Sequence, residues 1–593
     1  MQYILKLDRL VRVGMFKLAV FLKPYKKECI LGPAFKLLEA VLELLLPTVM
    51  VLIINKGVNM HDTAYVLKMG GLMLLMSVLG FACSIVCQYY AARASQGFGT
   101  TLRNTIFNHI SSLSHAEIDK FGTPSLINRI TNDVNQLQLA VAMLIRLVIR
   151  APFICIGAII MAMLLDFKLA LILLGATPVF AIILYFIISR SSPLYRSYQK
   201  KLDKIALVLR ENLSGVRVIR AFAKTDGEKY RFTASSDDLT ETAIHVGKVS
   251  ALLNPLTALV MNAAIIVILW MGGFHIHAGR LSQGEIIAFV NYITQILLAL
   301  IVVSNLVIIF TKAFASAGRV NEVLEDSTSI FDSINSASGI SDAGAQPIIR
   351  FQNVSFSYSA TGDMALTDVS IRINRGETVG IIGSTGSGKS TFLNLIPRFY
   401  DATEGKVCVD GLNVKEYPLR KLRGKIGIVP QKAVLFTGTI AENIRWGRQN
   451  ATDEEVVAAA KIAQADEFIR KLPDGYNTQV SRGGQNFSGG QKQRLTIARA
   501  MVAQPEILLL DDASSALDFA TDAALREALR KSADTMTVLI VSQRASTIKH
   551  ADKIIVFDDG HITGIGTHDE LMDSCEVYKE ICRSQLSGEE AGK

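Results

Sequence analysis

Residues 383–391 read Gly-Ser-Thr-Gly-Ser-Gly-Lys-Ser-Thr, which combines glycines, a lysine and hydroxyls in the order G-x-x-x-x-G-K-S. The glycines let backbone N–H groups turn inward around phosphate oxygens, and a helix beginning near Lys389 adds its positive dipole end. Lys389 then reaches the outer phosphates, and the Ser390 hydroxyl reaches Mg²⁺. A strand pattern at 378–382 before the loop and a helix pattern after it argue against a chance match. The predicted phosphate-binding residues are Gly383, Ser384, Thr385, Gly386, Ser387, Gly388, Lys389, Ser390 and Thr391.

Two carboxylates close a second apolar run, because residues 507–510 (Ile-Leu-Leu-Leu) lead directly into Asp511 and Asp512. In a fold built around a phosphate-binding loop, we expect this strand to lie beside the strand at 378–382. Its terminal Asp511 is then placed to hold the magnesium shell. The sequence therefore predicts a Mg²⁺–nucleotide site assembled from two separated segments.

Residues 487–491 (Phe-Ser-Gly-Gly-Gln), followed by Lys-Gln-Arg, resemble the signature motif of ATP-binding cassette (ABC) transporters. The resemblance implies ATP and Mg²⁺ as cofactors and extends to three further positions. Tyr358 matches the aromatic residue that stacks on adenine, Gln431 matches a glutamine at the magnesium ion, and residues 515–518 match the loop after the magnesium strand. The nucleotide-binding residues implied by the signature are Ser488, Gly489, Gly490 and Gln491, and the implied metal-binding residues are Ser390, Gln431 and Asp511.

Two positions depart from the pattern of the family that the chain resembles, and both face the γ-phosphate. That family has a water-activating glutamate after the magnesium aspartate, whereas this chain has Asp512, whose side chain is one methylene shorter. The family's switch histidine is replaced by Gln543, which can donate a hydrogen bond but cannot carry a proton or a charge at neutral pH. A third departure is residues 480–484 (Val-Ser-Arg-Gly-Gly), where many exporters have an acidic residue. The catalytic positions are Asp511, Asp512 and Gln543. We expect the site that contains them to bind ATP and to hydrolyse it slowly.

The resemblance also implies that each ATP lies between the phosphate-binding loop of one cassette and the signature motif of another. A homodimer of this chain would carry two defective sites, whereas a partner with the glutamate and the histidine would provide one competent site. The pattern is similar to that of bacterial heterodimeric multidrug exporters. We therefore expect the partner to be a second ABC half-transporter with intact catalytic Glu and His.

The elements before the cassette are apolar. Of the 593 residues, 50% are hydrophobic and 19% are charged, while soluble domains carry about 25% charged residues. This composition excludes a disordered chain, and seven cysteines in mostly apolar surroundings exclude a disulfide scaffold. Runs of about 20 apolar residues can each cross a bilayer as a helix. Six such spans are expected, at 29–55, 69–92, 141–165, 169–189, 249–279 and 286–311.

Charge placement predicts the orientation of these spans. The segment 190–248 holds twelve Lys and Arg against seven Asp and Glu, and the first 30 residues hold seven against two. The positive-inside bias places these segments and both chain ends in the cytoplasm, so we expect a multi-pass protein of the bacterial cytoplasmic membrane. The six spans account for much of the basic charge and exclude a soluble nucleic-acid ATPase. We expect no nucleic-acid partner.

Five charged residues fall inside or next to the expected spans: Lys36, Glu39, Glu43, Arg146 and Arg150. Charges at membrane depth usually face a bundle interior or a wet cavity, so they are candidates for a substrate pathway. The alternative is that the helices protrude into the cytoplasm and carry the charges there.

The predicted fold is an α-helical six-span transmembrane domain of ABC-exporter type, followed by an α/β P-loop nucleotide-binding domain. The expected boundaries are an amphipathic membrane-surface helix at 1–28, the transmembrane domain at 29–322, a linker at 323–347, the cassette at 348–585 and a flexible tail at 586–593. Segments 114–121 and 213–221 of the cytoplasmic loops are the expected coupling segments.

The most probable function from these patterns is ATP-driven export of small amphipathic or drug-like molecules across the lipid bilayer. Two alternatives remain open at this point. One is a regulatory ATP-binding subunit that does not contact the cargo, and the other is an importer of siderophore type built on the exporter fold.

Overall fold

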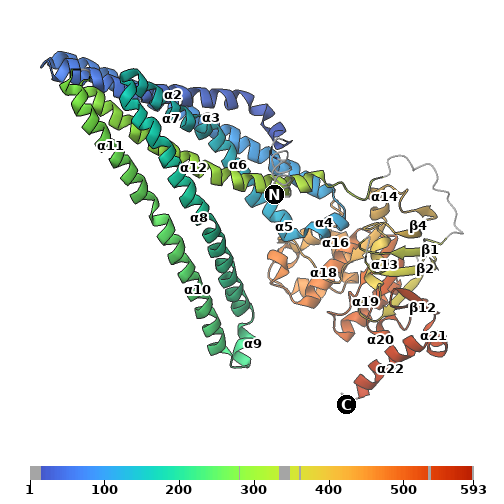
Figure 1. The fold of residues 1–593 in the computed structure, drawn as a ribbon. Coiled ribbons are helices and arrows are strands. Elements are labelled where there is room, and N and C mark those ends of the chain that lie inside the picture. Colours follow the sequence, from blue (N-terminus) through green and yellow to red (C-terminus); the bar gives the residue numbers. More distant parts are fainter. Residues whose placement is uncertain are drawn as a thin grey trace. The chain divides into compact units, whose positions relative to one another are not determined.

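The computed structural model describes residues 15, 17–279, 281–332, 347–359, 362–531 and 536–590, with side chains up to residue 585. The described chain forms two compact units. One comprises residues 1–111 and 123–326, and the other comprises residues 112–122 and 327–593. The second unit is therefore discontinuous, because it takes eleven residues from between two long helices of the first (Figure 1).

The first unit is built from long helices, and the six expected spans are confirmed. In the described residues, six helical segments are long and apolar enough to cross a membrane: Ala19–Val58, Thr63–Ser112, Thr123–Leu165, Phe167–Ser214, Thr225–His277 and Gln283–Glu325. The helix α3 (Thr63–Ser112) alone has 50 residues, or about 75 Å at 1.5 Å per residue. Since a bilayer core is about 30 Å thick, such helices extend well beyond it.

The segments divide into shorter helices where the hydrogen-bond pattern changes. The elements of this unit are η1 (Ala19–Tyr25), α2 (Lys26–Leu52), η2 (Ile53–Val58), α3, α5 (Thr123–Asn128), η3 (Arg129–Asp133), α6 (Val134–Met143), η4 (Leu144–Val148), α7 (Arg150–Leu165), α8 (Phe167–Ser214), α9 (Val216–Ala221), α10 (Thr225–Ala251), α11 (Leu253–His277) and α12 (Gln283–Glu325).

The chain start differs from the single surface helix expected over residues 1–28. Residues 1–14 and 16 of that prediction lie outside the described residues. From Ala19 to Tyr25 the backbone is a 3₁₀ helix containing Pro24, and the α-helix α2 begins only at Lys26. Proline lacks an N–H and opposes a continuous α-helix, which accounts for the break.

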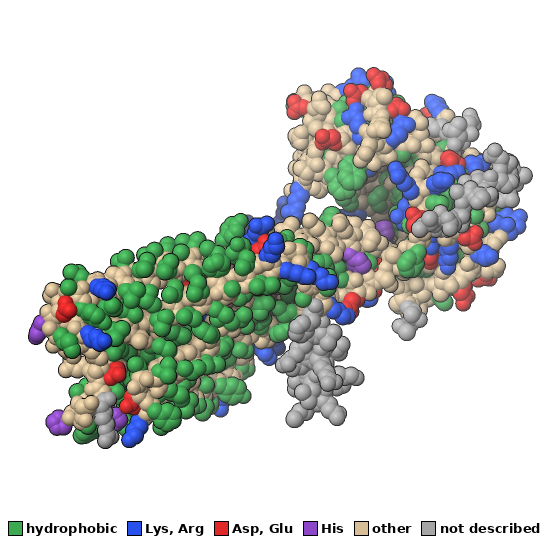
Figure 2. Space-filling view, turned by 90° about the horizontal axis from the view of Figure 1, so that it is seen from above, with side chains coloured by type: hydrophobic (Ala, Val, Ile, Leu, Met, Phe, Trp, Pro, Cys, Tyr) green, Lys and Arg blue, Asp and Glu red, His purple; other side chains and the backbone are tan. Residues whose placement is uncertain are grey.

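Figure 2 shows hydrophobic side chains gathered along the long helices. Many large ones are exposed, including Leu67, Phe81, Tyr185 and Trp270. A surface with this much apolar area is suited to lipid or to another protein rather than to water. A tight turn at Asp166 joins α7 to α8, and Asp166 caps the N-terminus of α8 by accepting a hydrogen bond from the Leu169 N–H.

The helix α12 is central to the packing of this unit and contacts α2, α6, α7, α8 and α11. The Tyr292 side chain is fully buried, and its hydroxyl donates to the Leu44 carbonyl at 3.1 Å. Near the end of α12, the Arg319 Nε donates to the buried Asp133 carboxylate at 2.8 Å. These contacts tie the last span to the first and the third.

Four of the five charged residues of the expected spans form ion pairs. The Lys36 ammonium lies 2.7 Å from the Glu39 carboxylate, and the Arg150 guanidinium lies 2.7 Å from Glu43. The second pair joins α2 to α7. Partial burial of these charges is offset by pairing, and Arg146 is half-buried in the π-helical segment η4.

The second unit contains three sheets. A four-stranded sheet has the order β2-β1-β4-β5, a six-stranded sheet has the order β12-β11-β3-β10-β9-β6, and β7 pairs with β8. The strands are β1 (Ile349–Phe356), β2 (Leu366–Ile373), β3 (Thr378–Gly383), β4 (Glu404–Val409), β5 (Leu412–Asn413), β6 (Ile426–Val429), β7 (Gly438–Thr439), β8 (Gln479–Val480), β9 (Ile507–Asp511), β10 (Thr537–Val541), β11 (Lys553–Asp558) and β12 (His561–Gly566).

The six-stranded sheet is parallel except for β12 at its edge. The expectation that the strand ending at Asp511 lies directly beside the strand before the phosphate-binding loop is wrong. The fully buried strand β10 lies between them and pairs in parallel with both β3 and β9. Parallel strands need long crossovers, so the order along the chain does not fix the order in the sheet.

The helices of this unit are short. They are α4 (His115–Phe121), α13 (Lys389–Leu395), α14 (Leu419–Gly424), α15 (Ile440–Arg445), α16 (Asp453–Ile462), α17 (Asp466–Arg470), η5 (Gly475–Asn477), η6 (Arg482–Gly484), α18 (Gly489–Val502), α19 (Phe519–Lys531), α20 (Ala545–Ile548), α21 (His568–Ser574) and α22 (Glu576–Glu590). Helix α18 packs against α15 and α16, and α22 continues past the expected boundary at residue 585. The expected linker at 323–347 falls mostly outside the described residues, and α12 runs through Glu325.

Candidate nucleotide site and coupling segments

The phosphate-binding loop connects β3 to α13. Its glycines Gly383, Gly386 and Gly388 have φ values of 156°, 89° and 96°, in the region that side chains disfavour. A Cβ at Gly383 would lie 2.1 Å from the Phe557 carbonyl oxygen, and one at Gly388 would lie 2.6 Å from that of Ala365. Glycine is therefore required at both ends of the loop by space as well as by conformation.

Lys389 lies at the first position of α13 and is only 8% exposed. Its ammonium donates to the carbonyl oxygens of Gly383 at 3.1 Å and Ser384 at 2.5 Å, and to the Ser387 hydroxyl at 3.3 Å. Burial lowers the pKa of Lys389, and the nearby Asp511 and Asp512 oppose this shift. The loop thus encloses the positively charged Lys389 ammonium, an arrangement that is suited to binding a phosphate.

The carboxylates at the end of β9 meet this loop. The Ser390 hydroxyl donates to Asp511 at 2.9 Å, and the Gln431 side-chain amide donates to Asp512 at 3.5 Å. Burial is the main cause that raises the pKa of both Asp511 and Asp512. Ser390, Asp511 and Gln431 come from three separate segments, and together they provide the oxygen ligands that Mg²⁺ prefers.

Asp512 has a left-handed backbone with φ of 47°, a conformation that aspartate tolerates better than most residues. With Gln543 it lines a pocket of about 450 Å³, together with Ser514, Ser515 and Arg544. The Gln543 side chain is exposed. The two positions that depart from the family pattern therefore face one pocket.

A residue that the sequence motifs do not identify holds the loop containing Gln543. The Gln585 side chain, on α22, donates to the Gln543 carbonyl at 2.7 Å and accepts from the Ala545 N–H at 2.8 Å. One amide group therefore bridges both sides of the loop. Nothing in the sequence around residue 585 indicates this role, because the two segments are far apart along the chain.

Tyr358 follows β1 and is 55% exposed, so one side of its ring is accessible to a stacking partner. Its hydroxyl lies 3.0 Å from that of Thr391, the last residue of the phosphate-binding segment. The predicted adenine-stacking residue and the phosphate-binding loop are thus brought together. The residues present fit a Mg²⁺–ATP group, which would occupy the loop with its base on Tyr358.

The signature segment forms the N-terminus of α18. Ser488 is the N-cap, and a capping box joins it to Gln491 through hydrogen bonds of 2.9 and 3.3 Å. Ser488 and Gly489 are exposed, and among the described residues no hydrogen bond or ion pair links this segment to residues 383–391. An exposed helix N-terminus carries partial positive charge suited to an anion, so the segment is available to a phosphate bound elsewhere.

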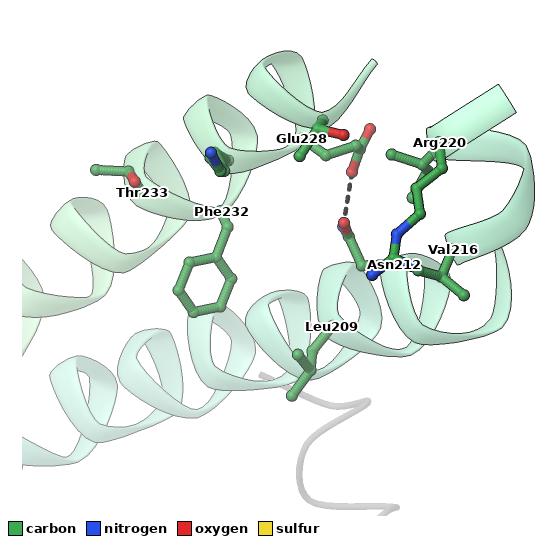
Figure 3. Close-up of a pocket in the computed structure, with 10 residues that line it drawn as sticks. Leu209, Asn212, Val216, Arg220, Glu228, Phe232 and Thr233 are labelled. Carbon is green, nitrogen blue, oxygen red and sulfur yellow. Dashed lines mark hydrogen bonds between the residues drawn. The ribbon is translucent and has the colours of Figure 1, made fainter. Parts of the chain in front are cut away.

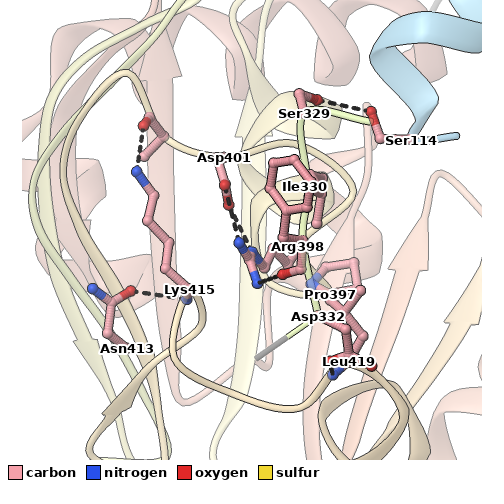
Figure 4. Close-up of polar contacts among 12 residues, drawn as sticks. Ser114, Ser329, Ile330, Asp332, Pro397, Arg398, Asp401, Asn413, Lys415 and Leu419 are labelled. Carbon is pink, nitrogen blue, oxygen red and sulfur yellow. Dashed lines mark hydrogen bonds and ion pairs between the residues drawn. The ribbon is translucent and has the colours of Figure 1, made fainter. Parts of the chain in front are cut away.

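The first expected coupling segment is the helix α4, which belongs to the cassette unit. A capping box forms between Ser114 and Glu117, and Glu117 also accepts from the Ser329 N–H at 3.1 Å. Burial alone would raise the pKa of Glu117, but hydrogen bonds from Ser114 and Ser329 lower it overall. The Ser114 and Ser329 hydroxyls lie 3.0 Å apart (Figure 4).

Residues 327–332, which we call the strap, continue from this contact into the cassette. The Arg398 guanidinium donates to the Phe331 carbonyl at 3.2 Å, and the Asp332 carboxylate accepts from the Leu419 N–H at 2.8 Å (Figure 4). Arg398 is 5% exposed and also pairs with Asp401. The strap therefore connects α4 to the buried part of the cassette.

The second expected coupling segment contains α9, which turns the chain from α8 into α10. A pocket of about 480 Å³ lies at this turn, lined by Asn212, Ile219, Arg220, Phe232 and other residues (Figure 3). The Asn212 side chain donates to Glu228 at 2.7 Å and closes the turn. The nearby Val218 and Phe222 are 60% and 73% exposed, which leaves apolar side chains at the tip.

Comparison with known protein families gives two matches. The model of the ABC transporter transmembrane region matches residues 29–300, and the ABC transporter model matches residues 366–515.

Similar proteins span the whole chain. An ABC transporter ATP-binding protein of Mycobacterium tuberculosis is 39% identical over 567 residues, covering 95% of this chain and 97% of its own. A Bacillus subtilis protein that is named as a multidrug export ATP-binding/permease protein is 36% identical to this chain. The match covers 95% of this chain and 97% of the Bacillus protein. The solved structure of a bacterial Atm1-family ABC exporter with ATP bound is also similar. It has a TM-score of 0.76 and 25% identity, with coverage of 94% of this chain and 98% of its own.

Proposed function

Because the chain belongs to the ABC transporter family and has the architecture of an exporter half-transporter, we propose that it is the degenerate-site subunit of a heterodimeric exporter. In this proposal it moves amphipathic or drug-like small molecules out across the bacterial cytoplasmic membrane. Its partner is a second half-transporter that has the catalytic glutamate and histidine.

The observation that carries the proposal is the combination of an intact phosphate-binding loop with Asp512 and Gln543. Lys389 and Ser390 are held in place to bind a nucleotide. A general base must come within about 2.6–3.2 Å of the proton that it takes, and the shorter Asp512 side chain retracts from that position. Gln543 cannot supply the charge or proton of a histidine. Binding without efficient hydrolysis follows.

The roles of the site residues follow from their chemistry. Lys389 and the loop N–H groups bind the phosphates, Tyr358 stacks on the base, and Ser390, Gln431 and Asp511 hold Mg²⁺. Bound Mg²⁺ neutralises charge on the phosphates. Ser488 and the N-terminus of α18 face the nucleotide bound by the partner, and the exposure of this segment supports that arrangement.

The transport cycle we propose begins when ATP draws the two cassettes together. Helix α4 and the segment around α9 carry that movement to the spans, which then open outward. The hydrogen bond that Glu117 accepts from the Ser329 N–H of the strap supports a coupling role for α4. The exposed apolar side chains of Val218 and Phe222 support docking of the α9 tip on a protein surface.

The proposed cargo class rests on the similarity to multidrug-export proteins and on the charges within the spans. The pairs Lys36–Glu39 and Glu43–Arg150 place both signs of charge next to apolar helices. A molecule with an apolar body and a charged group could exchange for one member of such a pair. Glu39 and Glu43 are therefore the proposed contacts for a cationic group.

The proposal is tested by co-producing the chain with the half-transporter encoded beside it and preparing inside-out membrane vesicles. ATP-dependent accumulation of a fluorescent amphipathic cation is expected, and loss of accumulation on changing Glu39→Gln with Glu43→Gln would place cargo on this chain. Accumulation that is unaffected by these changes, and photolabelling by a drug analogue on the partner alone, would favour a regulatory subunit. ATP-dependent depletion of the vesicle lumen would instead indicate an importer.

A further inference from the structure

A continuous set of side-chain contacts leads from α4 to the predicted adenine-stacking residue, and Tyr400 is its centre. The Tyr400 hydroxyl donates to the Asp119 carboxylate on α4 at 2.6 Å. Both residues lie in the cassette unit. Burial, followed by Asp119, raises the pKa of the Tyr400 hydroxyl, so this group remains a protonated donor. A hydrogen bond from a hydroxyl to a carboxylate is among the stronger kinds in proteins.

The ring of Tyr400 makes the next contact. The rings of Tyr400 and Tyr358 meet edge to face, with ring centres 5.2 Å apart and planes at 85°. Phe356 packs against both rings, at 4.8 Å from Tyr358 and 5.6 Å from Tyr400. Edge-to-face contacts of this kind depend on ring orientation. A change in the orientation of the Tyr358 ring therefore alters its contact with the Tyr400 ring.

The last contact reaches the phosphate-binding segment. The Tyr358 hydroxyl lies 3.0 Å from the Thr391 hydroxyl, and Thr391 adjoins Ser390, which donates to Asp511. Tyr358 is thus held at its hydroxyl end and by its ring contact with Tyr400, while 55% of its surface is exposed. A base that stacks on this exposed side restricts the remaining motion of the Tyr358 ring.

Helix α4 is docked by a second aromatic contact beside the first. The His115 ring stacks on Phe399, with centres 4.4 Å apart and planes at 27°. Burial and the nearby Arg423 lower the pKa of His115, and Asp119 opposes this shift. The neutral ring suits an apolar stacking contact. Phe399 and Tyr400 are sequence neighbours, so one short segment contacts two residues of α4 that lie about one helical turn apart.

We propose that Tyr400 is a positioning residue that couples occupancy of the adenine-stacking face of Tyr358 to the docking of α4. Binding of the nucleotide base then affects the membrane unit independently of the γ-phosphate. This inference rests on the proposed assignment of Tyr358 as the adenine-stacking residue, and it does not depend on how fast the site hydrolyses ATP. Coupling of this kind is reciprocal, so loss of the Tyr400–Asp119 bond also weakens base binding.

The test uses the full chain in lipid nanodiscs and measures backbone hydrogen exchange of residues 112–122. ATP is expected to slow exchange in this segment, and inorganic tripolyphosphate, which has no base, is not. In Tyr400→Phe the effect of ATP should be lost, and ATP affinity should fall by about five-fold, the lower end of typical coupling factors. Tripolyphosphate affinity should not change. Asp119→Ala, which removes the acceptor, should reproduce both effects.

Tyr417→Phe is the matched control, because Tyr417 is buried in the same unit and its hydroxyl has no hydrogen-bond partner in the structure. Equal protection of residues 112–122 by ATP and tripolyphosphate would overturn the inference, as would persistence of the ATP effect in Tyr400→Phe. Faster exchange of α4 in Tyr400→Phe without any nucleotide, combined with unchanged affinity for ATP, would show a purely structural anchor and would also overturn it. Rapid ATP hydrolysis by this chain would contradict the proposed degenerate site and leave these exchange measurements interpretable.

Discussion

At the scale of single residues, Asp512 and Gln543 depart from the family pattern, whereas the neighbouring residues that bind the nucleotide match it. Ser390 donates a hydrogen bond to Asp511, and Gln431 donates one to Asp512. Lys389 is enclosed by its loop. In the proposed function, the deficit is therefore confined to activation of water. A site of this kind retains the affinity for ATP and loses much of the rate.

Restoring the two missing groups should restore hydrolysis. Asp512→Glu with Gln543→His is expected to raise single-turnover hydrolysis at this site by about a hundred-fold, the usual contribution of a general base. Because cooperating groups are non-additive, the pair should exceed the sum of the single changes. The measurement uses a complex whose partner has its catalytic glutamate replaced by glutamine. An unchanged rate, with the fold intact, would show that the block lies outside these two residues.

The two ATP sites of the proposed complex should respond differently to changes in this chain. Ser488→Ala is expected to lower turnover by about a hundred-fold, as when one donor to a developing charge is removed, because Ser488 faces the partner's competent site. Lys389→Ala should weaken nucleotide binding at the degenerate site by about ten-fold, with partial loss of turnover.

The control for Ser488→Ala is Thr452→Ala, which removes the same type of capping box from α16 in the same unit. Loss of a capping hydroxyl costs about 1 kcal/mol of stability, so Thr452→Ala reports that cost without touching the signature. Equal losses of steady-state ATPase in Ser488→Ala and Lys389→Ala would contradict one competent and one degenerate site.

The residue pattern predicts the phosphate-binding loop because its glycines and lysine have a local physical reason. The structure brings Tyr358 and Asp511 to this segment, through contacts with Thr391 and Ser390. Tyr400 and Gln585 could not be predicted in this way. Each acts through hydrogen bonds to segments far away along the chain, Asp119 and Gln543, and tyrosine or glutamine at a single position carries no spacing signal.

At the scale of elements, the helix α22 connects the chain end to the loop after β10. Gln585 donates to the Gln543 carbonyl and accepts from the Ala545 N–H. The loop is thereby fixed on both sides of Arg544. Gln543, Arg544 and Gln585 line the same pocket as Asp512.

Removing this bridge should loosen the loop without unfolding the cassette. Gln585→Ala is expected to speed hydrogen exchange at Ala545 by about ten-fold, because two neutral hydrogen bonds of about 1 kcal/mol each are lost and partly replaced by water. Gln585→Glu keeps the acceptor and loses the donor, so exchange should be intermediate. Exchange in both variants at the native rate would show that α22 does not hold the loop.

Hydrophobic patterning predicts the six spans because long apolar runs have few alternatives to membrane helices. It does not predict the position of β10, since strand order in a parallel sheet depends on long crossovers. It also does not predict the 3₁₀ helix at 19–25, where Pro24 interrupts a pattern that otherwise favours one amphipathic helix. Element type is thus encoded locally, whereas element adjacency is not.

At the scale of the whole molecule, the chain alone should be a poor ATPase. Purified in lipid, it is expected to hydrolyse ATP about a hundred-fold more slowly than the complex with its partner, given the usual contribution of a general base. Steady-state phosphate release from the chain, the partner and the mixture measures this. Fast, cooperative hydrolysis by the chain alone would rule out the heterodimer proposal.

The discontinuity of the cassette unit has a consequence for synthesis. Residues 112–122 leave the ribosome long before the residues that they contact, so Glu117 and Asp119 are made before Ser329 and Tyr400 exist. Until then α4 is a seven-residue helix, far below the length at which isolated helices are stable. Helix α4 therefore lacks these partners until the rest of the chain has been made, and a nascent protein truncated before residue 400 leaves Asp119 without its hydrogen-bond donor.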